Sequence, residues 1–275
     1  MEPLGNDGAT LTFGYGRLVT HPQAGSAGGT ADTFTIRLSY PVIRAVHETL
    51  VVNADANALN SNAAYLGQGL SDERTRSLRI GAIYGKEDSW GGTTILSGTF
   101  SHGLDTLGAR RGSVAFGGPD YAKFYGAVAR EQKLPLDLVL RARVMGQYAT
   151  HHLPSTEQFL FGGPDMGKAF NYAYLAGDRG MAGYVELAHP MPGFMTPKVL
   201  AGSEFFGYTD WGEVSTLDTP YQFRYARAAS AGLGIRLKLI NAFSLELGGA
   251  WVLNHSRGLA HTSSPRIVFS VGGHF

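Results

Sequence analysis

The chain has 275 residues, a formal net charge of +1, no cysteine, 16% charged residues, 11% aromatic residues and 38 glycines. The near-neutral charge gives no support for nucleic-acid binding, which calls for clustered Lys and Arg, and the lack of cysteine excludes disulfides and thiolate chemistry. Soluble domains carry charge on about a quarter of their residues, and no apolar run here reaches the roughly 18–20 residues of a membrane-spanning helix. Any membrane contact would therefore be made by strands.

Apolar and polar residues alternate with a period of two along most of the chain, a pattern typical of strands. The alternation predicts twelve strands, at residues 9–20, 33–40, 48–58, 75–85, 92–103, 121–130, 136–150, 180–189, 198–208, 226–239, 243–254 and 266–275. In the last of them, Ile267, Phe269 and Val271 lie on one face, whereas Arg266 and Ser270 lie on the other. A strand of about ten residues has the length that a tilted strand needs to cross a bilayer.

The connections between these strands alternate between short turns and long loops. The turns lie at 41–47, 86–91, 131–135, 190–197 and 240–242, and the loops at 59–74, 104–120, 151–179 and 210–222. Outer-membrane barrels combine short periplasmic turns, long extracellular loops and an even number of strands. A water-soluble sandwich fits less well, because its strands average about five or six residues. The sequence therefore predicts an all-β fold, a single antiparallel transmembrane β-barrel domain over residues 1–275.

Charged residues of the predicted strands fall on the face opposite to the apolar one. They are Arg37, Asp55, Arg79, Arg141, Arg143, Glu186, Glu204, Arg236, Lys238, Glu246 and Arg266. A charge that faces lipid at the middle of the bilayer costs about 2–4 kcal/mol, so this face is predicted to line the lumen. Both signs of charge occur, as expected if the charges pair across the lumen.

The longest predicted loop, residues 151–179, combines apolar residues with a Gly162-Gly163-Pro164 turn. Such a turn requires positive φ angles or very tight packing. Loops longer than about 12–15 residues are usually functional or disordered. Because this loop is too long and too apolar to extend into water, it is predicted to fold against or into the barrel.

Two segments resemble the transporters of two-partner secretion, the hemolysin and adhesin activation/secretion family. Residues 155–159, 162–163 and 177–180, which follow Gln147, match that family's Ser-Ser/Thr-Glu-Gln-Phe, Gly-Gly and Gly-Asp-Arg-Gly. Residues 208–212 match its Phe-x-Asp-x-Gly motif. The loop tip differs, because residues 167–170, Gly-Lys-Ala-Phe, stand where the family has Val-Arg-Gly followed by Tyr or Phe.

The resemblance implies that the loop tip folds into the lumen and that Lys168 pairs there with Asp210. Lys supplies the charge of Arg without its planar fork, so this pair is expected to be looser. The implied gating residues are Gly162, Gly163, Lys168, Ala169, Phe170, Asp210 and Gly212, and the implied lumen charges are Arg141, Arg143, Glu186, Glu204 and Arg236.

Family barrels have sixteen strands that follow two periplasmic polypeptide-transport (POTRA) domains. The twelve strands predicted here would correspond to the C-terminal twelve, with the POTRA domains and the first four strands absent. The start of the chain has neither a basic region nor an apolar region of a signal peptide, which favours a fragment. The alternative is a smaller, closed barrel of twelve strands.

The resemblance implies a translocator in the outer membrane of a Gram-negative bacterium that exports a large hemolysin- or adhesin-type exoprotein and is gated by residues 151–179. The alternatives are a diffusion porin or small-solute channel, and an assembly factor for outer-membrane proteins. The sequence has no Gly-x-Ser-x-Gly nucleophile motif, and we expect no enzymatic activity, metal or cofactor. The expected partners are the exoprotein, outer-membrane lipid and lipopolysaccharide, with no nucleic acid.

Overall fold

A single antiparallel sheet makes up almost all of the structure, a computed structural model that describes residues 2–4, 7–20, 27–65, 68–192, 200–217, 224–239, 243–259 and 264–273. The sheet has thirteen strands, of which β1 (Glu2–Leu4) is a short addition to the edge. The long strands are β2 (Ala9–Thr20), β3 (Ala27–Arg44), β4 (Glu48–Tyr65), β5 (Gln68–Glu87), β6 (Gly92–Gly103), β7 (Ala122–Lys133), β8 (Val139–Ala149), β11 (Arg179–Pro190), β12 (Glu204–Ser215), β13 (Tyr225–Leu239), β14 (Phe243–His255) and β15 (Arg266–Gly273). The predicted all-β antiparallel fold is therefore confirmed.

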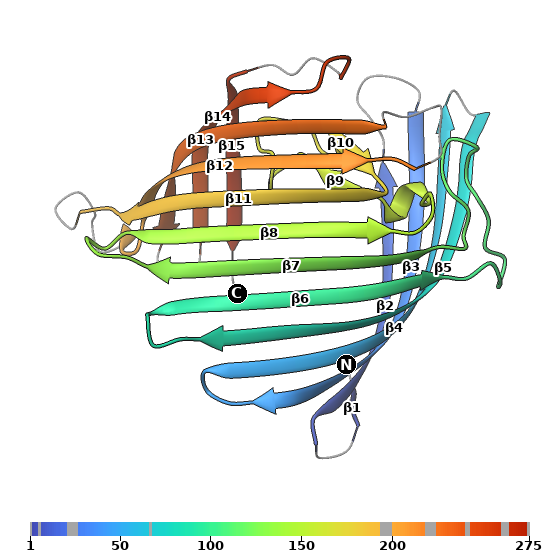
Figure 1. The fold of residues 1–275 in the computed structure, drawn as a ribbon, viewed down its shortest axis with the longest axis horizontal. Coiled ribbons are helices and arrows are strands. Elements are labelled where there is room, and N and C mark those ends of the chain that lie inside the picture. Colours follow the sequence, from blue (N-terminus) through green and yellow to red (C-terminus); the bar gives the residue numbers. More distant parts are fainter. Residues whose placement is uncertain are drawn as a thin grey trace.

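Each long strand pairs with its neighbours in sequence, apart from one insertion (Figure 1). β8 pairs directly with β11, because the segment between them forms the 3-10 turn η1 (Ser155–Glu157) and a separate ladder of β9 (Phe159–Phe161) and β10 (Leu175–Gly177). Among the described residues, no helix has the length and apolar character needed to cross a membrane.

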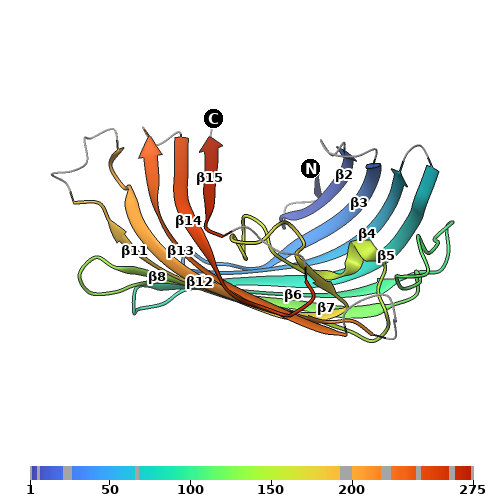
Figure 2. The ribbon, with the colours of Figure 1, turned by 90° about the horizontal axis from the view of Figure 1, so that it is seen from above.

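The sheet curls into a trough whose two rims are β2 and β15 (Figure 2). Curvature of this kind follows from the right-handed twist that antiparallel strands accumulate across a wide sheet. Within the described residues no ladder joins the two rims, so the wall is open between the N-terminal and C-terminal strands.

The outer, convex face of the trough is apolar, as the alternation predicts. Ile267 and Phe269 on β15 are 78% and 72% exposed, and Phe34 and Ile36 on β3 are about half exposed. An exposed apolar face of this extent is unfavourable in water, whereas it matches the apolar band that faces lipid in a transmembrane barrel.

The concave face carries the charges that the alternation assigns to the lumen. Arg37, Asp55 and Arg79 are direct neighbours across β3, β4 and β5, and Arg37 Nε lies 2.8 Å from Asp55 Oδ1. Arg37 and Asp55 thus form an ion pair between adjacent strands of the wall. The expectation that they pair across the lumen is wrong at this position, because neighbouring strands already bring opposite charges within contact.

Several predicted boundaries are also wrong, among them those of β3, which runs from Ala27 to Arg44 where the prediction gives 33–40. Residues 59–74, predicted as a long loop, belong mostly to β4 and β5, whose ladder runs from the Glu48–Lys86 pair to the Tyr65–Gln68 pair. Backbone pairing needs no apolar side chains, so the ladder continues through this polar stretch. β12 begins later and ends later than the predicted strand at 198–208, which places Asp210 inside the sheet. Residues 66–67, 193–199, 218–222, 240–242 and 274–275 of the predicted strands, turns and loops lie outside the described residues.

Candidate functional site

Residues 151–179, here called the lumen loop, lie inside the trough against the concave face of the sheet (Figure 2). Most of the large apolar side chains of the loop are buried in one cluster with residues of β11 to β14. The loop contributes Phe159, Phe161, Met166, Ala169, Phe170 and Leu175, and the strands contribute Ala182, Ala188, Phe206, Tyr208, Val214, Ala226, Ala228 and Ala250. Burial of this surface holds the loop in the trough, which confirms the prediction that it folds against or into the barrel.

Glycines allow close packing within the lumen loop and between the loop and the wall. Gly162 and Gly163 have φ angles of 111° and 125°, a region that other residues rarely adopt. Gly212 on β12 is needed for a different reason, because a Cβ atom there would lie 2.5 Å from the ring of Phe161. Gly212 thus leaves the space in which the ring of Phe161 packs on the wall.

Asp210 binds the backbone of the loop tip. Its side chain is fully buried on β12, and its Oδ2 accepts a hydrogen bond of 2.8 Å from the amide of Gly167. The amide of Lys168 also donates to this carboxylate, and Oδ1 accepts a hydrogen bond from the hydroxyl of Ser230 on β13. A buried carboxylate with several donors of this kind is strongly held in place.

The predicted ion pair of Lys168 with Asp210 is wrong. Lys168 Nζ lies 2.5 Å from Oε1 of Glu246 on β14, with the ring centroids of Tyr208 and Phe206 5.1 and 5.5 Å away. Because backbone amides and Ser230 already occupy the oxygens of Asp210, the long Lys168 side chain extends to the next carboxylate. Carboxylate and aromatic faces together stabilise an ammonium group.

The C-terminal part of the tip is fixed by the wall as well. Ala169 and Phe170 are fully buried, and the Phe170 ring stacks on Tyr174 with centroids 4.6 Å apart. Arg266 on β15 donates to the carbonyl oxygen of Phe170 over 2.7 Å and to Oδ1 of Asn171 over 2.5 Å. The tip therefore contacts three strands of the C-terminal half of the sheet, namely β12, β14 and β15.

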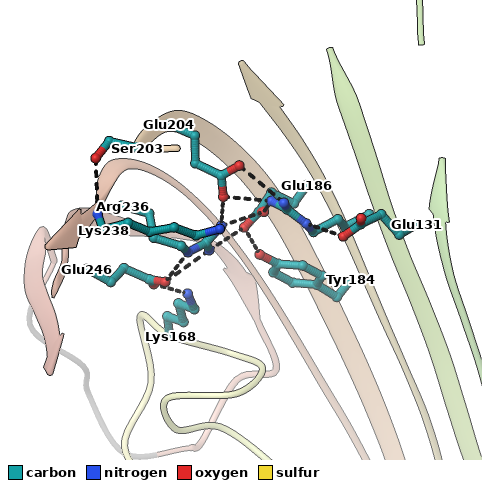
Figure 3. A network of polar contacts seen from close by, with 10 residues as sticks. Glu131, Lys168, Tyr184, Glu186, Ser203, Glu204, Arg236, Lys238 and Glu246 are labelled. Atoms are coloured by element: carbon teal, nitrogen blue, oxygen red, sulfur yellow. Dashed lines mark hydrogen bonds and ion pairs between the residues drawn. The ribbon is translucent and has the colours of Figure 1, made fainter. Parts of the chain in front are cut away.

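Glu246 connects the tip to a network of charges on the wall (Figure 3). Its Oε2 accepts hydrogen bonds of 3.1 and 3.0 Å from Arg236. Arg236 also binds Glu186 and Glu204, and both glutamates bind Arg141 with 2.8 Å contacts. The strand register places these opposite charges side by side on adjacent strands, so four of the five predicted lumen charges belong to one network with Lys168.

Arg143, the fifth predicted lumen charge, lies outside this network but lines the same cavity. The cavity has a volume of about 840 Å³ and is bordered by the wall charges and by residues of the loop tip, including Asp165 and Lys168. Of the predicted gating residues Lys168 lines this cavity, so it meets the predicted lumen-facing charges at one place on the concave face.

Glu73, a residue that the sequence does not single out, holds the other end of the lumen loop. Glu73 on β5 is buried, and its two oxygens accept hydrogen bonds from the amides and hydroxyls of Ser155 and Thr156, at 2.6 to 3.2 Å. Glu73 falls within the predicted loop at 59–74, 82 residues from Ser155. No local pattern connects residues so far apart.

Glu157 forms a second fixed point at this end. Its carboxylate lies 2.7 Å from Arg79 Nη2 and 2.9 Å from Lys123 Nζ, on β5 and β7. Burial raises the pKa of Glu157, but the two cations lower it by more, so that it lies below its usual value. The lumen loop thus crosses the trough from β5 and β7 to β14 and β15.

Comparison with known proteins places these features in a family. The family model of haemolysin secretion/activation proteins (ShlB/FhaC/HecB) matches residues 15–237. No curated protein matches the chain. Among solved structures, CdiB from Escherichia coli has 17% identity and a TM-score of 0.76, over 89% of this chain and 45% of that one.

Two further structures have the same fold. CdiB from Acinetobacter baumannii has 19% identity and a TM-score of 0.66, over 93% of this chain and 45% of that one. BamA from Haemophilus ducreyi, lacking POTRA domains 1–3, has 12% identity and a TM-score of 0.66, over 98% of this chain and 60% of that one. At these identities the likeness shows the fold, which is that of an outer-membrane β-barrel. The chain spans about half the length of the CdiB structures that it matches.

Proposed function

The chain belongs to the family of haemolysin secretion/activation proteins, and on that basis we propose that it forms part of an outer-membrane translocator that exports a large exoprotein in two-partner secretion. The lumen loop is the gate of this translocator. Export requires no chemical reaction, and we propose no enzymatic activity, cofactor or metal. The exoprotein is of the hemolysin or adhesin type.

One observation carries this proposal. The lumen loop crosses the concave face, and its tip is fixed there by polar contacts to three strands, from Gly167 to Asp210, from Lys168 to Glu246 and from Phe170 to Arg266. None of these contacts belongs to the strand ladders, so their release, together with that of the buried side chains of the tip, would free the tip without unfolding the strands. A gate of this kind fits a conduit that opens only when its substrate is present.

The outer surface supports the proposed location and partners. The apolar convex face would contact lipid, as in other transmembrane barrels. The loop between β6 and β7 carries Arg110 and Arg111, which would contact lipopolysaccharide phosphates. Arg110 already pairs with Asp72, and the exposed Arg111 is the better candidate of the two.

The family match favours secretion over the other functions that a barrel can perform. It includes both the lumen loop and Asp210, whereas the likeness to BamA is one of fold. A diffusion porin would need an open lumen, but here a buried apolar cluster joins the loop to the wall.

The proposal can be tested in a Gram-negative host that lacks the protein. The full-length protein is produced together with its exoprotein, and exoprotein at the cell surface and uptake of a small solute are both measured. We expect surface exoprotein to depend on the transporter and solute uptake to stay low. Free solute uptake with retained exoprotein would instead indicate a porin, and loss of other outer-membrane proteins upon deletion would indicate an assembly factor.

A further inference from the structure

The wall beneath the loop tip has the parts of a peptide-binding surface. Asp210 accepts hydrogen bonds from backbone amides, and Arg266 donates to a backbone carbonyl. Between these two groups, Glu246 and the faces of Tyr208 and Phe206 surround an ammonium group. This set of groups recognises a lysine together with the peptide backbone on either side of it.

The tip that occupies this surface holds its own shape. The amides of Gly162 and Gly163 donate to the carbonyls of Met166 and Gly167 over 3.2 and 3.3 Å, and the amide of Phe170 donates to Gly167 over 2.8 Å. These bonds lie within the loop and do not depend on the wall. The tip can therefore leave the wall as a preformed turn, with the loss of only its contacts to the wall.

Departure of the tip would expose the wall surface and leave some of its polar groups without hydrogen-bond partners. Glu246 would keep Arg236 and Asp210 would keep Ser230, but Asp210 would lose its amide donors and Glu246 would lose its ammonium partner. Buried acceptors without donors are unfavourable, so the surface would favour another ligand of the same chemistry. The cavity of about 840 Å³ beside Lys168 and Glu246 gives a chain in the lumen access to it.

From this arrangement we infer that the wall surface formed by Asp210, Glu246, Arg266 and the rings of Phe206 and Tyr208 binds a lysine-containing segment of the exported polypeptide. The loop tip is then an internal ligand that occupies the surface until such a segment displaces it. The inference rests on the proposed function, because that function supplies the polypeptide that enters the lumen.

A synthetic peptide with the sequence of residues 165–172 serves as the probe. Its binding to the detergent-solubilised full-length protein is measured by fluorescence anisotropy. The wild-type protein is compared with the Lys168→Ala variant, in which the protein's own loop tip competes less strongly with the peptide for the wall surface. We expect the peptide to bind the Lys168→Ala protein about tenfold more tightly than wild type, which corresponds to the loss of one ion pair from the competitor. A peptide with Met in place of its lysine should bind about tenfold more weakly.

Two further variants separate the surface from the rest of the protein. Glu246→Gln in the Lys168→Ala background should abolish the preference for the lysine peptide. Glu87→Gln, which removes an exposed carboxylate at the β5–β6 turn that pairs with His47, should have no effect. Heat-modifiable migration on gels confirms that each variant is folded.

Equal binding of the lysine and methionine peptides, or no binding of either to Lys168→Ala, would overturn the inference. The outcome is separable from that of the proposed function, because peptide binding needs no exoprotein. Peptide binding without export by the wild-type protein would contradict the translocator function alone, and export without peptide binding would contradict the binding site alone.

Discussion

The amide nitrogen of Gly167 lies 2.8 Å from Oδ2 of Asp210, so that a buried carboxylate of the wall binds the backbone of the loop tip. The contact does not depend on the side chain at position 168. This explains how a lysine can stand at a position where the family pattern has arginine. The charged Lys168 side chain instead pairs with Glu246 on β14, which is separated from the strand of Asp210, β12, by β13.

Asp210→Ala should release the loop tip. The substitution leaves the amides of Gly167 and Lys168 and the hydroxyl of Ser230 without their acceptor, and each unsatisfied buried group costs about 1–3 kcal/mol. Asp210→Asn keeps one carbonyl acceptor and should have a smaller effect. The conductance of the full-length protein in planar bilayers is expected to rise in the order wild type, Asn, Ala. Equal conductance of all three proteins would contradict the role of Asp210.

Lys168→Met should weaken the tip less than Asp210→Ala does. Glu246 retains Arg236 as a partner, so the loss of Lys168 does not leave a buried charge without a counter-ion. A double-mutant cycle of Lys168→Met with Glu246→Gln, measured by urea unfolding in lipid vesicles, should give a coupling energy of about 0.5–3 kcal/mol. Additive effects of the two substitutions would show that the ion pair does not hold the tip.

Gly212→Ala should displace the lumen loop from the wall. A Cβ atom at this position would lie 2.5 Å from the ring of Phe161, and overpacking of this kind costs about 1–3 kcal/mol. Gly207→Ala on the same strand is the matched control, because its Cβ atom would have its nearest neighbour at 3.8 Å. On denaturing gels, the temperature at which half of the protein migrates in its unfolded form should fall for Gly212→Ala. It should stay unchanged for Gly207→Ala. A similar shift in both variants would mean that Gly212 has no special packing role.

Acid should release the other end of the lumen loop. Burial raises the pKa of Glu157, but Lys123 and Arg79 outweigh burial and hold it below the usual value. A carboxylate with a depressed pKa contributes stability above its unfolded pKa of about 4.3, and this stability is lost as the pH falls through the lower folded value. Unfolding midpoints from pH 7 to pH 3 should therefore fall more steeply for wild type than for Glu157→Gln. Parallel curves would contradict this role.

The alternation of apolar and polar residues predicts which face of the sheet each side chain occupies. A shift of the strand register by one residue would move every side chain to the other face, so only one register keeps the apolar residues together. Arg141, Glu186 and Arg236 accordingly lie on the concave face, where the alternation places them. The ends of strands are less predictable. β4 and β5 continue through polar residues because backbone hydrogen bonds alone sustain their ladder, and β12 includes Asp210 because the loop tip satisfies its carboxylate inside the sheet.

The site could be predicted in part. Gly162 and Gly163 are recognisable because a Gly-Gly-Pro turn needs unusual backbone angles, and Asp210 and Gly212 are recognisable from a short motif. The partners of the loop cannot be read in the same way. Glu246 lies 78 residues from Lys168, and the pairing of such distant residues depends on strand register, which no local pattern specifies.

The most direct test of a gate formed by the loop tip is a reversible cross-link between the tip and the wall. The chain has no cysteine of its own, so Lys168→Cys and Glu246→Cys can be joined in the full-length protein by a bis-methanethiosulfonate reagent and separated again with dithiothreitol. The single-cysteine variants, treated in the same way, are the controls. We predict that the cross-link stops exoprotein export and that reduction restores it. Undiminished export by the fully cross-linked protein would contradict the account.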